Sequence, residues 1–407
     1  MKRLVVLILL LAAWTAAPAS AEPLKLERVV MLTRHGVRPP TKAEVTPPGV
    51  AADPWPQWNT PYGHLTAHGY AAIRLLGAAD RMRWSKAGLL PRRGCPAPGE
   101  VVVWSDSDER TIRTGDALLE GLAPGCGLVN GHNPEGEDDP LFSPPERASM
   151  DPAAARAAIV EAVGPLDAVA AAHRQELDAL GRVLGCCAAP ACPSAAASCS
   201  LADLQSAFVD GGGRPKLSGP LDFGPTAAQT LMLEYVEGLP MAEVGWGRAT
   251  RQDIEQLMGL HAMKGEVLQR PLYIAARGAG PLLKRMLEAL NGPARLTVLV
   301  GHDTNISEMS GLLGFDWHVP SYPANTPPPG GAFGLALYED AAGKRFVRAF
   351  YRSQTMDQMR DLTPLDARSP PFFQWLTIDG CGAADRAASC ALETLERLAE
   401  TRLAAAR

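Results

Sequence analysis

The stretch from Val29 to Lys42, VVMLTRHGVRPPTK, places the strongest constraint on the fold. Its apolar run Val29 to Leu32 predicts a buried strand, and the prolines behind it exclude a helix directly afterwards. At the end of this strand, Arg34 and Arg38 flank His35. Like charges this close repel each other unless something anionic lies between them. The stretch therefore predicts a strand end that binds an anionic group.

A second strand with the same kind of ending lies far along the chain. The strictly apolar run Leu296 to Val300 is followed by the turn GHDTN, which contains His302 and Asp303. In an open α/β sheet, ligands bind in the crevice at the carboxyl ends of the strands. Both histidine-containing turns are therefore expected to open into one pocket.

The remaining pattern predicts an α/β fold. A helix is expected from Thr66 to Trp84 with a threonine cap, and a β-branched strand from Val101 to Trp104 is followed by a loop and a helix. Strands that alternate with helices predict a mainly parallel sheet covered by helices on both faces. Residues 131–269 carry helical spacing and cysteine-rich loops but no convincing strand. They predict an inserted helical cap domain, so that 22–130 and 270–407 form the α/β domain.

The first residues predict export. Lys2 and Arg3 precede an apolar run from Leu4 to Trp14 that is too short to cross a bilayer, and Ala19-Ser20-Ala21 fits a cleavage site. Residues 1–21 are thus expected to be a signal peptide, and the mature protein to be periplasmic or secreted and free of the membrane. A retained membrane anchor is the alternative.

Composition and charge limit the classes of molecule that the chain is expected to bind. With 407 residues, of which 46% are hydrophobic, the chain can bury a substantial core. Signal cleavage changes the formal net charge from −5 to about −7. Because no basic stripe offsets this excess, nucleic acid is excluded as an expected partner. A monomer that acts on a small molecule is expected.

The chain has eight cysteines, an even number that in an oxidising compartment predicts four disulfides. Separation favours Cys95 with Cys126 and Cys381 with Cys390. The other four are expected to pair among themselves, and the adjacent Cys186 and Cys187 are not expected to bond each other. A zinc site is the alternative, but no C-x-x-C spacing is present.

The cations near the predicted pocket fit a phosphoryl group. Arg34 and Arg38 would meet one or both of Arg110 and Arg113, which follow the Val101 strand. A phosphate monoester carries close to two negative charges, and arginine forks match its oxygens in pairs. The cluster therefore predicts a phosphomonoester ligand.

Given a bound phosphoryl group, the histidines and the aspartate acquire chemical roles. A neutral His35 imidazole can attack phosphorus and split hydrolysis into two steps through a phosphohistidine. Asp303 can protonate the leaving alkoxide, and His302 can donate a hydrogen bond to the phosphoryl oxygens. Because the arginines stabilise the transferring charge, no metal or other cofactor is required.

These residues also carry a family resemblance. The motifs RHGVRPP, DERT and GHDTN, in this order and at wide separation, resemble the histidine acid phosphatase family in its branch with a large helical insertion. The chain is most similar to bacterial periplasmic phytases and glucose-1-phosphatases, and GWGR, NTPPPGG and QMRDLTPL extend the resemblance over most of the mature chain. The resemblance implies an α/β domain with a helical cap.

Carried over residue by residue, the resemblance implies roles for single positions. It implies His35 as the nucleophile and Asp303 as the proton donor. It selects Arg110 over Arg113, so that the implied phosphate clamp consists of Arg34, Arg38, Arg110 and His302. It also implies four substrate-pocket residues, namely Lys42, Asp106, Glu234 and His261. For Asp106 an ordinary turn residue, and for Glu234 and His261 ordinary polar cap residues, are the alternative interpretations.

The predicted function is therefore an exported, metal-independent acid phosphatase that acts on phytate or sugar phosphates such as glucose 1-phosphate. Two alternatives stay open at this point. A periplasmic protein that binds phosphorylated ligands without hydrolysis would not need the pair His35 and Asp303. A metal-dependent phosphatase would lose its activity to a chelator.

Overall fold

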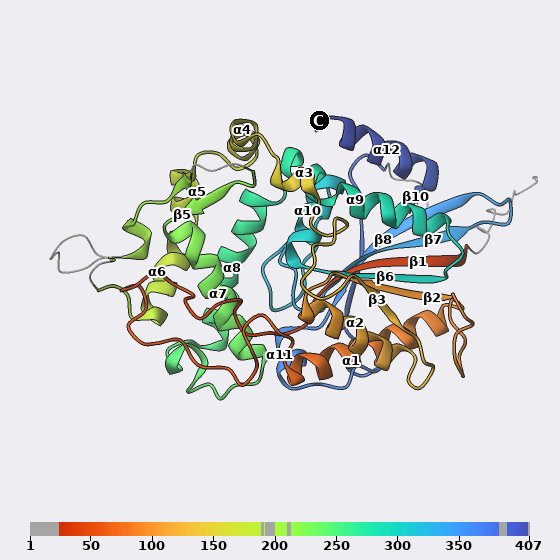
Figure 1. Cartoon of the computed structure of the whole chain (residues 1–407), viewed down its shortest axis with the longest axis horizontal. Helices are drawn as coiled ribbons and strands as arrows, with labels where there is room; N and C mark the ends of the chain where they lie inside the picture. The colour runs from red at the N-terminus through yellow and green to blue at the C-terminus, as the bar shows by residue number, and fades with distance from the viewer. Residues whose placement is uncertain (1–23, 189–190, 192–199, 210–212, 382–388, 406–407) are drawn as a thin grey trace, which may run out of the picture.

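The computed structural model describes residues 24–188, 191, 200–209, 213–381 and 389–405. The expected signal peptide therefore lies outside the described residues. The described chain forms a sheet lobe and a helical lobe that lie side by side (Figure 1). Within the described ranges, no helix is both long and apolar enough to cross a membrane.

The sheet lobe is built on one sheet with the strand order β10-β8-β7-β1-β6-β2-β3, and β9 also pairs with β8. Its strands are β1 Lys25–Arg34, β2 Val101–Ser105, β3 Asn130–His132, β6 Leu296–Gly301, β7 Ala332–Glu339, β8 Arg345–Ser353, β9 Phe372–Leu376 and β10 Ser389–Ala391.

The sheet is mixed, whereas the sequence predicts a mainly parallel one. Strands β1, β6, β2 and β3 run parallel to each other, but β7 pairs antiparallel with β1, and β8, β9 and β10 continue antiparallel. For the pair β7 and β8, the reason is the short link between them, which spans only residues 340–344. A parallel pair needs a crossover of a dozen or more residues, so these two strands form a hairpin. The parallel half of the sheet is the half that carries the predicted site.

Helices cover both faces of the sheet, as predicted (Figure 1). One face carries α1 Ala67–Lys86 and α2 Glu109–Leu122, and the other carries α9 Leu272–Asn291, α10 Asp303–Leu313 and α12 Leu392–Ala405. Alternate residues of β1 point to opposite faces. Val29 and Met31 join the core beneath α1 and α2, and Val30 and Leu32 join the core beneath α9 and α10.

The helical lobe falls within the 131–269 segment, whose exact domain boundaries stay a prediction. Its α-helices are α3 Pro145–Ala148, α4 Pro152–Val163, α5 Leu166–Ala172, α6 Arg174–Leu184, α7 Pro220–Val236 and α8 Arg251–Leu268. Two short 3₁₀ turns lie at Leu201–Asp203 and Val244–Gly247. A small hairpin of β4 Ala207–Val209 and β5 Lys216–Ser218 lies where the sequence predicts no strand. The short helix α11 Met356–Arg360 packs against α7.

The cap of α1 joins the two lobes. As predicted, Thr66 caps the helix, and its Oγ1 accepts a hydrogen bond from the Gly69 amide at 2.8 Å. The same hydroxyl donates to Glu237 Oε2 at 2.6 Å, at the end of α7. One side chain therefore both starts a helix of the sheet lobe and fixes it to the helical lobe.

The disulfides agree with the prediction at two positions and differ at one. Cys95 bonds Cys126 and Cys381 bonds Cys390, with Cα atoms 5.4 and 5.2 Å apart. The expectation that Cys186 and Cys187 do not bond each other is wrong. The peptide between them is cis, which brings their Cα atoms to 3.0 Å, and the two sulfurs are joined. Cys192 and Cys199 lie outside the described residues.

Candidate active site

The two histidine turns meet because their strands are parallel neighbours. Arg34 at the end of β1 pairs in register with Gly301 at the end of β6, and the His35 amide donates to the Gly301 carbonyl at 2.9 Å. The rings of His35 and His302 lie with their centroids 5.5 Å apart. The two motifs thus open into one place, although more than 260 residues separate them in the sequence.

A cavity of about 330 Å³ lies at this edge of the sheet. Its walls combine the strand-end residues with residues from the helical segment. The lining side chains include His35, Arg38, Asp106, Asp108, Arg110, Asp139, Arg147, Arg214, His302 and Asp303. Its volume lies in the range of pockets that hold small molecules.

His35 is buried and holds its ring in one defined state. Its Nδ1 lies 2.8 Å from the carbonyl oxygen of Gly36. Because a carbonyl can only accept, Nδ1 carries the proton of the neutral ring and Nε2 keeps a lone pair. Burial, and then the charges of Arg110, Arg38 and Arg34, lower the pKa of His35 well below its ordinary value. The ring is therefore neutral, as a nucleophile must be, even in acid.

The arginines around His35 are crowded. Arg34 is fully buried and donates through Nη1 to the Pro327 carbonyl at 2.6 Å. Burial, together with the charges of Arg34 and Arg110, lowers the pKa of Arg38 to about 9. Among the described residues, the Nε atoms of Arg34, Arg38 and Arg110 are buried without a hydrogen-bond partner. Three such donors around one imidazole form a site that an anion would satisfy.

Asp303 is the first residue of α10, directly beside the arginines. Its Oδ1 accepts from the Thr304 amide at 2.8 Å. Its Oδ2 lies 3.2 Å from Arg34 Nη2 and 3.4 Å from His261 Nε2. Burial would raise the pKa of Asp303, but Arg34 and the hydrogen bond from His261 hold it well below its ordinary range. In the ligand-free site this carboxyl group is ionised.

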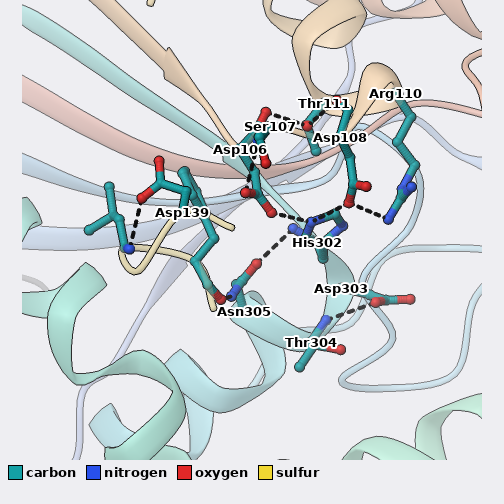
Figure 2. A network of polar contacts seen from close by, with 12 residues as sticks. Asp106, Ser107, Asp108, Arg110, Thr111, Asp139, His302, Asp303, Thr304 and Asn305 are labelled. Carbon is teal, nitrogen blue, oxygen red and sulfur yellow. Dashed lines mark hydrogen bonds and ion pairs between the residues drawn. The ribbon is translucent and has the colours of Figure 1, made fainter. Parts of the chain in front are cut away.

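His302 is fixed by Asp106, at the end of β2 (Figure 2). Its Nε2 lies 2.6 Å from Asp106 Oδ2, and its backbone amide donates to Asn305 Oδ1 at 2.9 Å. Because an ionised carboxylate only accepts, Nε2 carries a proton. Asp106 also accepts through Oδ1 from the Ser107 amide at 2.9 Å. It therefore acts both as a turn residue and as a pocket residue.

Within the described ranges, one group of side chains lies close enough together to hold a metal ion. The ligand atoms of Asp106, Asp108 and His302 lie within 4.8 Å of one another. Their hydrogen bonds explain this proximity, because the protonated His302 Nε2 donates to Asp106, and Arg110 Nη2 contacts Asp108 at 2.6 Å (Figure 2). The nearby guanidinium would repel a cation. This donor set therefore suits an anchor for His302 and Arg110 better than a metal centre.

The other predicted residues are placed differently. His261, on α8, lies in the site beside Asp303. Arg113 is half-exposed and pairs with Asp116, whereas Arg110 lines the cavity. Lys42 is exposed and lines a second cavity of about 650 Å³ with residues of the Asp53 loop and the start of α7.

Glu234 lies away from the catalytic cavity. It is fully buried on α7, where its Oε2 accepts from the Gly245 amide at 2.9 Å. Burial raises the pKa of Glu234 to about 7, although the Gly245 amide opposes this shift. Its position is that of a buried structural acid of the helical lobe, and a different residue of α7 contacts the site residues.

That residue is Gln229, which sequence reasoning missed. Its Nε2 donates to Asp303 Oδ2 at 3.1 Å and lies 3.1 Å from His261 Nε2, and its Oε1 accepts from Arg38 Nη2 at 3.4 Å. The available signal was a polar residue within the apolar run of α7, because a buried amide needs partners. Arg147 and Arg214, which line the same cavity, lie in segments without a recognisable motif.

The comparisons with known proteins agree with this site. Residues 25–160 match the histidine phosphatase superfamily (branch 2). The chain is 34% identical to phytase AppA of Escherichia coli, over 93% of this chain and 92% of that protein. It is 29% identical to a glucose-1-phosphatase of Salmonella typhimurium, over 96% of each protein.

Solved structures give the same result. The Hafnia alvei phytase in complex with tartrate superposes with a TM-score of 0.86 and 35% identity, covering 95% of this chain and 98% of that one. The same phytase has been solved with myo-inositol hexakis sulphate, again with a TM-score of 0.86. The chain therefore belongs to branch 2 of the histidine phosphatase superfamily, as a histidine acid phosphatase that hydrolyses phosphomonoesters.

Proposed function

We propose that the protein is an exported, metal-independent acid phosphatase that forms a phosphohistidine on His35 and acts on phytate or on sugar phosphates such as glucose 1-phosphate. The observation that carries the mechanism is the state of His35, whose Nδ1 faces the Gly36 carbonyl and whose Nε2 keeps its lone pair among the arginines. Phosphoryl transfer without a metal needs positioned cations and a nucleophile, and this site contains both.

In the first step, Arg34, Arg38 and Arg110 bind the phosphoryl oxygens. His302 joins them by sharing with the phosphate the Nε2 proton that Asp106 holds in the free site. The lone pair of His35 Nε2 attacks phosphorus, so that an N–P bond forms and the ester P–O bond breaks. The leaving alkoxide takes a proton from Asp303. The arginines stabilise the charge on the transferring group throughout this step.

The proton on Asp303 arrives with the substrate. The carboxyl is ionised in the free site, because its pKa is held low by Arg34 and His261. A bound phosphate brings negative charge beside it, which raises the pKa of the carboxyl group. Below a pH of about 6 the substrate itself carries an acidic proton that Asp303 can accept. The site is therefore best suited to acid conditions.

In the second step, water hydrolyses the phosphohistidine. Asp303, now ionised, takes a proton from the attacking water, the N–P bond breaks, and inorganic phosphate leaves. His35 returns to its neutral state with the proton still on Nδ1. The proton that Asp303 took from water passes to the departing phosphate, so each group regains its starting protonation state.

Several observations support the substrate class and the compartment. The similar Hafnia alvei phytase binds myo-inositol hexakis sulphate, and the relatives include both phytases and a glucose-1-phosphatase. The disulfides Cys95–Cys126 and Cys381–Cys390 are typical of an oxidising compartment, in keeping with cleavage after Ala21 and a periplasmic or secreted protein.

The test is phosphate release by the purified mature protein in EDTA. We expect hydrolysis of p-nitrophenyl phosphate in the chelator, and a comparison of kcat/KM for phytate and glucose 1-phosphate then assigns the substrate.

His35→Ala is expected to lose at least about a thousandfold in kcat with an unchanged circular dichroism spectrum. Asp303→Asn should slow alkyl phosphates far more than p-nitrophenyl phosphate, whose anion leaves unaided. Ligand binding without phosphate release would instead indicate a binding protein, and loss of activity in EDTA a metal enzyme.

A further inference from the structure

The cavity that contains His35 has a second pair of arginines, which the proposed chemistry does not use. Arg147 is in α3 and Arg214 lies just before β5, and both line the cavity together with His35 and Asp303. The phosphoryl clamp comes from the ends of β1 and β2 and the start of α10. The second pair comes from the helical segment and thus forms a different part of the wall.

Glu308 holds this pair in place. It is fully buried on α10, and its Oε2 lies 2.5 Å from Arg147 Nη2. The backbone of α9 makes room for it at Gly278, where a Cβ would overlap the Glu308 carboxylate. A buried carboxylate is costly without a cation, so this ion pair fixes the position of Arg147.

The pair retains an excess of positive charge. One buried carboxylate faces two guanidinium groups, and Arg214 feels the attraction of Glu308 and the repulsion of Arg147. Burial and this repulsion lower the pKa of Arg214. Within the described part of the chain, the Nε of Arg147 is buried and has no hydrogen-bond partner. Excess charge and an unused donor in a cavity wall are satisfied when an anion binds there.

Three other acidic residues of the cavity, Asp106, Asp108 and Asp139, are hydrogen-bonded to other groups, and Asp138 on the cavity wall is exposed. Asp139 accepts from the Trp104 indole at 2.9 Å and from the Leu141 amide at 2.9 Å. Asp106 and Asp108 are bonded to His302 and Arg110, as described above. These hydrogen bonds fix the Asp106, Asp108 and Asp139 carboxylates at other partners, whereas Glu308 is in direct contact with Arg147.

We propose that Arg147 and Arg214 form a second anion-binding subsite, which takes a further phosphate group of the substrate whose reacting phosphoryl group lies at His35. The proposal rests on the proposed phosphatase function and specifies its substrates as phosphomonoesters that carry at least one more phosphate. The cavity of about 330 Å³ has room for more than one phosphoryl group.

The experiment compares two substrates in EDTA, p-nitrophenyl phosphate with one phosphate and myo-inositol hexakisphosphate with several. For Arg214→Ala, we expect kcat/KM for the hexakisphosphate to fall about tenfold to a hundredfold more than kcat/KM for p-nitrophenyl phosphate, because charge-assisted hydrogen bonds are lost only with the larger substrate. Arg113→Ala, which removes an exposed arginine of α2, is the matched control and should leave the ratio as it is in the wild type. An equal fall for both substrates in Arg214→Ala would overturn the subsite.

Arg147 needs a second variant, because its removal alone strands a buried carboxylate. The double variant Arg147→Met with Glu308→Gln removes both charges and should show the same selective loss. Calorimetric binding of myo-inositol hexasulfate tests the subsite without hydrolysis, and its Kd is expected to rise about tenfold or more in Arg214→Ala. An unchanged Kd would refute the subsite alone. A wild-type protein that binds the hexasulfate but hydrolyses neither ester would refute the phosphatase function alone.

Discussion

Glu234 offers a test of how burial controls the stability of this protein. Its carboxyl group has no solvent contact, and burial raises its pKa from 4.5 to about 7. Between these two values the folded chain keeps a proton that the unfolded chain releases. The stabilisation from this group is therefore fully present below a pH of about 4.5 and is lost as the pH rises through about 7. The shift corresponds to on the order of 3 kcal/mol.

The perturbation is Glu234→Gln, which keeps an oxygen that can accept from the Gly245 amide but cannot ionise. Urea unfolding at pH 4.5 and at pH 8 gives the free energy of unfolding of each protein. We expect the wild type to lose on the order of 3 kcal/mol more than the variant between the two pH values. Glu237, whose pKa burial also raises to about 7, is present in both proteins and cancels in the difference.

The control is Glu243→Gln, an exposed position in the same part of the helical lobe, which should follow the wild type at both pH values. If the unfolding free energies of wild type and Glu234→Gln fall in parallel with pH, the carboxyl group is not buried in the way described here. The reasoning from burial to protonation would then be refuted at this position.

Two further substitutions test side-chain contacts in and beside the site. Gln229→Glu places a second carboxylate about 3.1 Å from Asp303 Oδ2, which raises the pKa of Asp303. The high-pH limb of the pH profile of kcat should therefore move up by about one pH unit or more. A pH profile that does not move would contradict the contact between these two side chains. Gly278→Ala puts a Cβ onto the Glu308 carboxylate and should lower the unfolding free energy by about 1 to 3 kcal/mol in urea melts. Equal stability would show that Glu308 does not lie against α9.

The sequence predicted the strand-end half of the site well. An apolar run followed by a histidine turn marks the end of β1 and of β6, and the parallel pairing of Arg34 with Gly301 brings both turns together. Arg110 and Arg113 both follow β2, the next parallel strand, and the family resemblance rather than spacing selected Arg110. These positions depend on local pattern and on a general rule of α/β sheets, so no tertiary detail was needed.

The half of the site formed by the helical segment was harder to predict. Glu234 and Gln229 both lie on α7, but five positions along a helix amount to a rotation of about 140°. Gln229 therefore faces Asp303, while Glu234 faces Gly245 in the lobe interior. Which face of α7 meets the cavity is decided by how it packs against α8, and no local motif records that packing.

The predictions of a mainly parallel sheet and of no bond between Cys186 and Cys187 were wrong for related reasons. The strands β7 and β8 were expected, but their direction follows from the length of the link between them, and the prediction of a mainly parallel sheet did not weigh it. The pairing of Cys186 with Cys187 joins two neighbours in the sequence, which the prediction from sequence separation excluded. Arg147 and Arg214 stand in unremarkable sequence, and only the fold brings them to the cavity.

The central claim is that His35 becomes phosphorylated during turnover. The direct measurement mixes the protein rapidly with p-nitrophenyl phosphate at low temperature, quenches in alkali, which preserves phosphohistidine, and identifies the modified peptide by mass spectrometry. We predict a phosphoryl group on His35 that forms and decays at rates that account for kcat. Phosphate release with the phosphoryl group found on another residue, or on no residue at any time before the first turnover is complete, would contradict the mechanism.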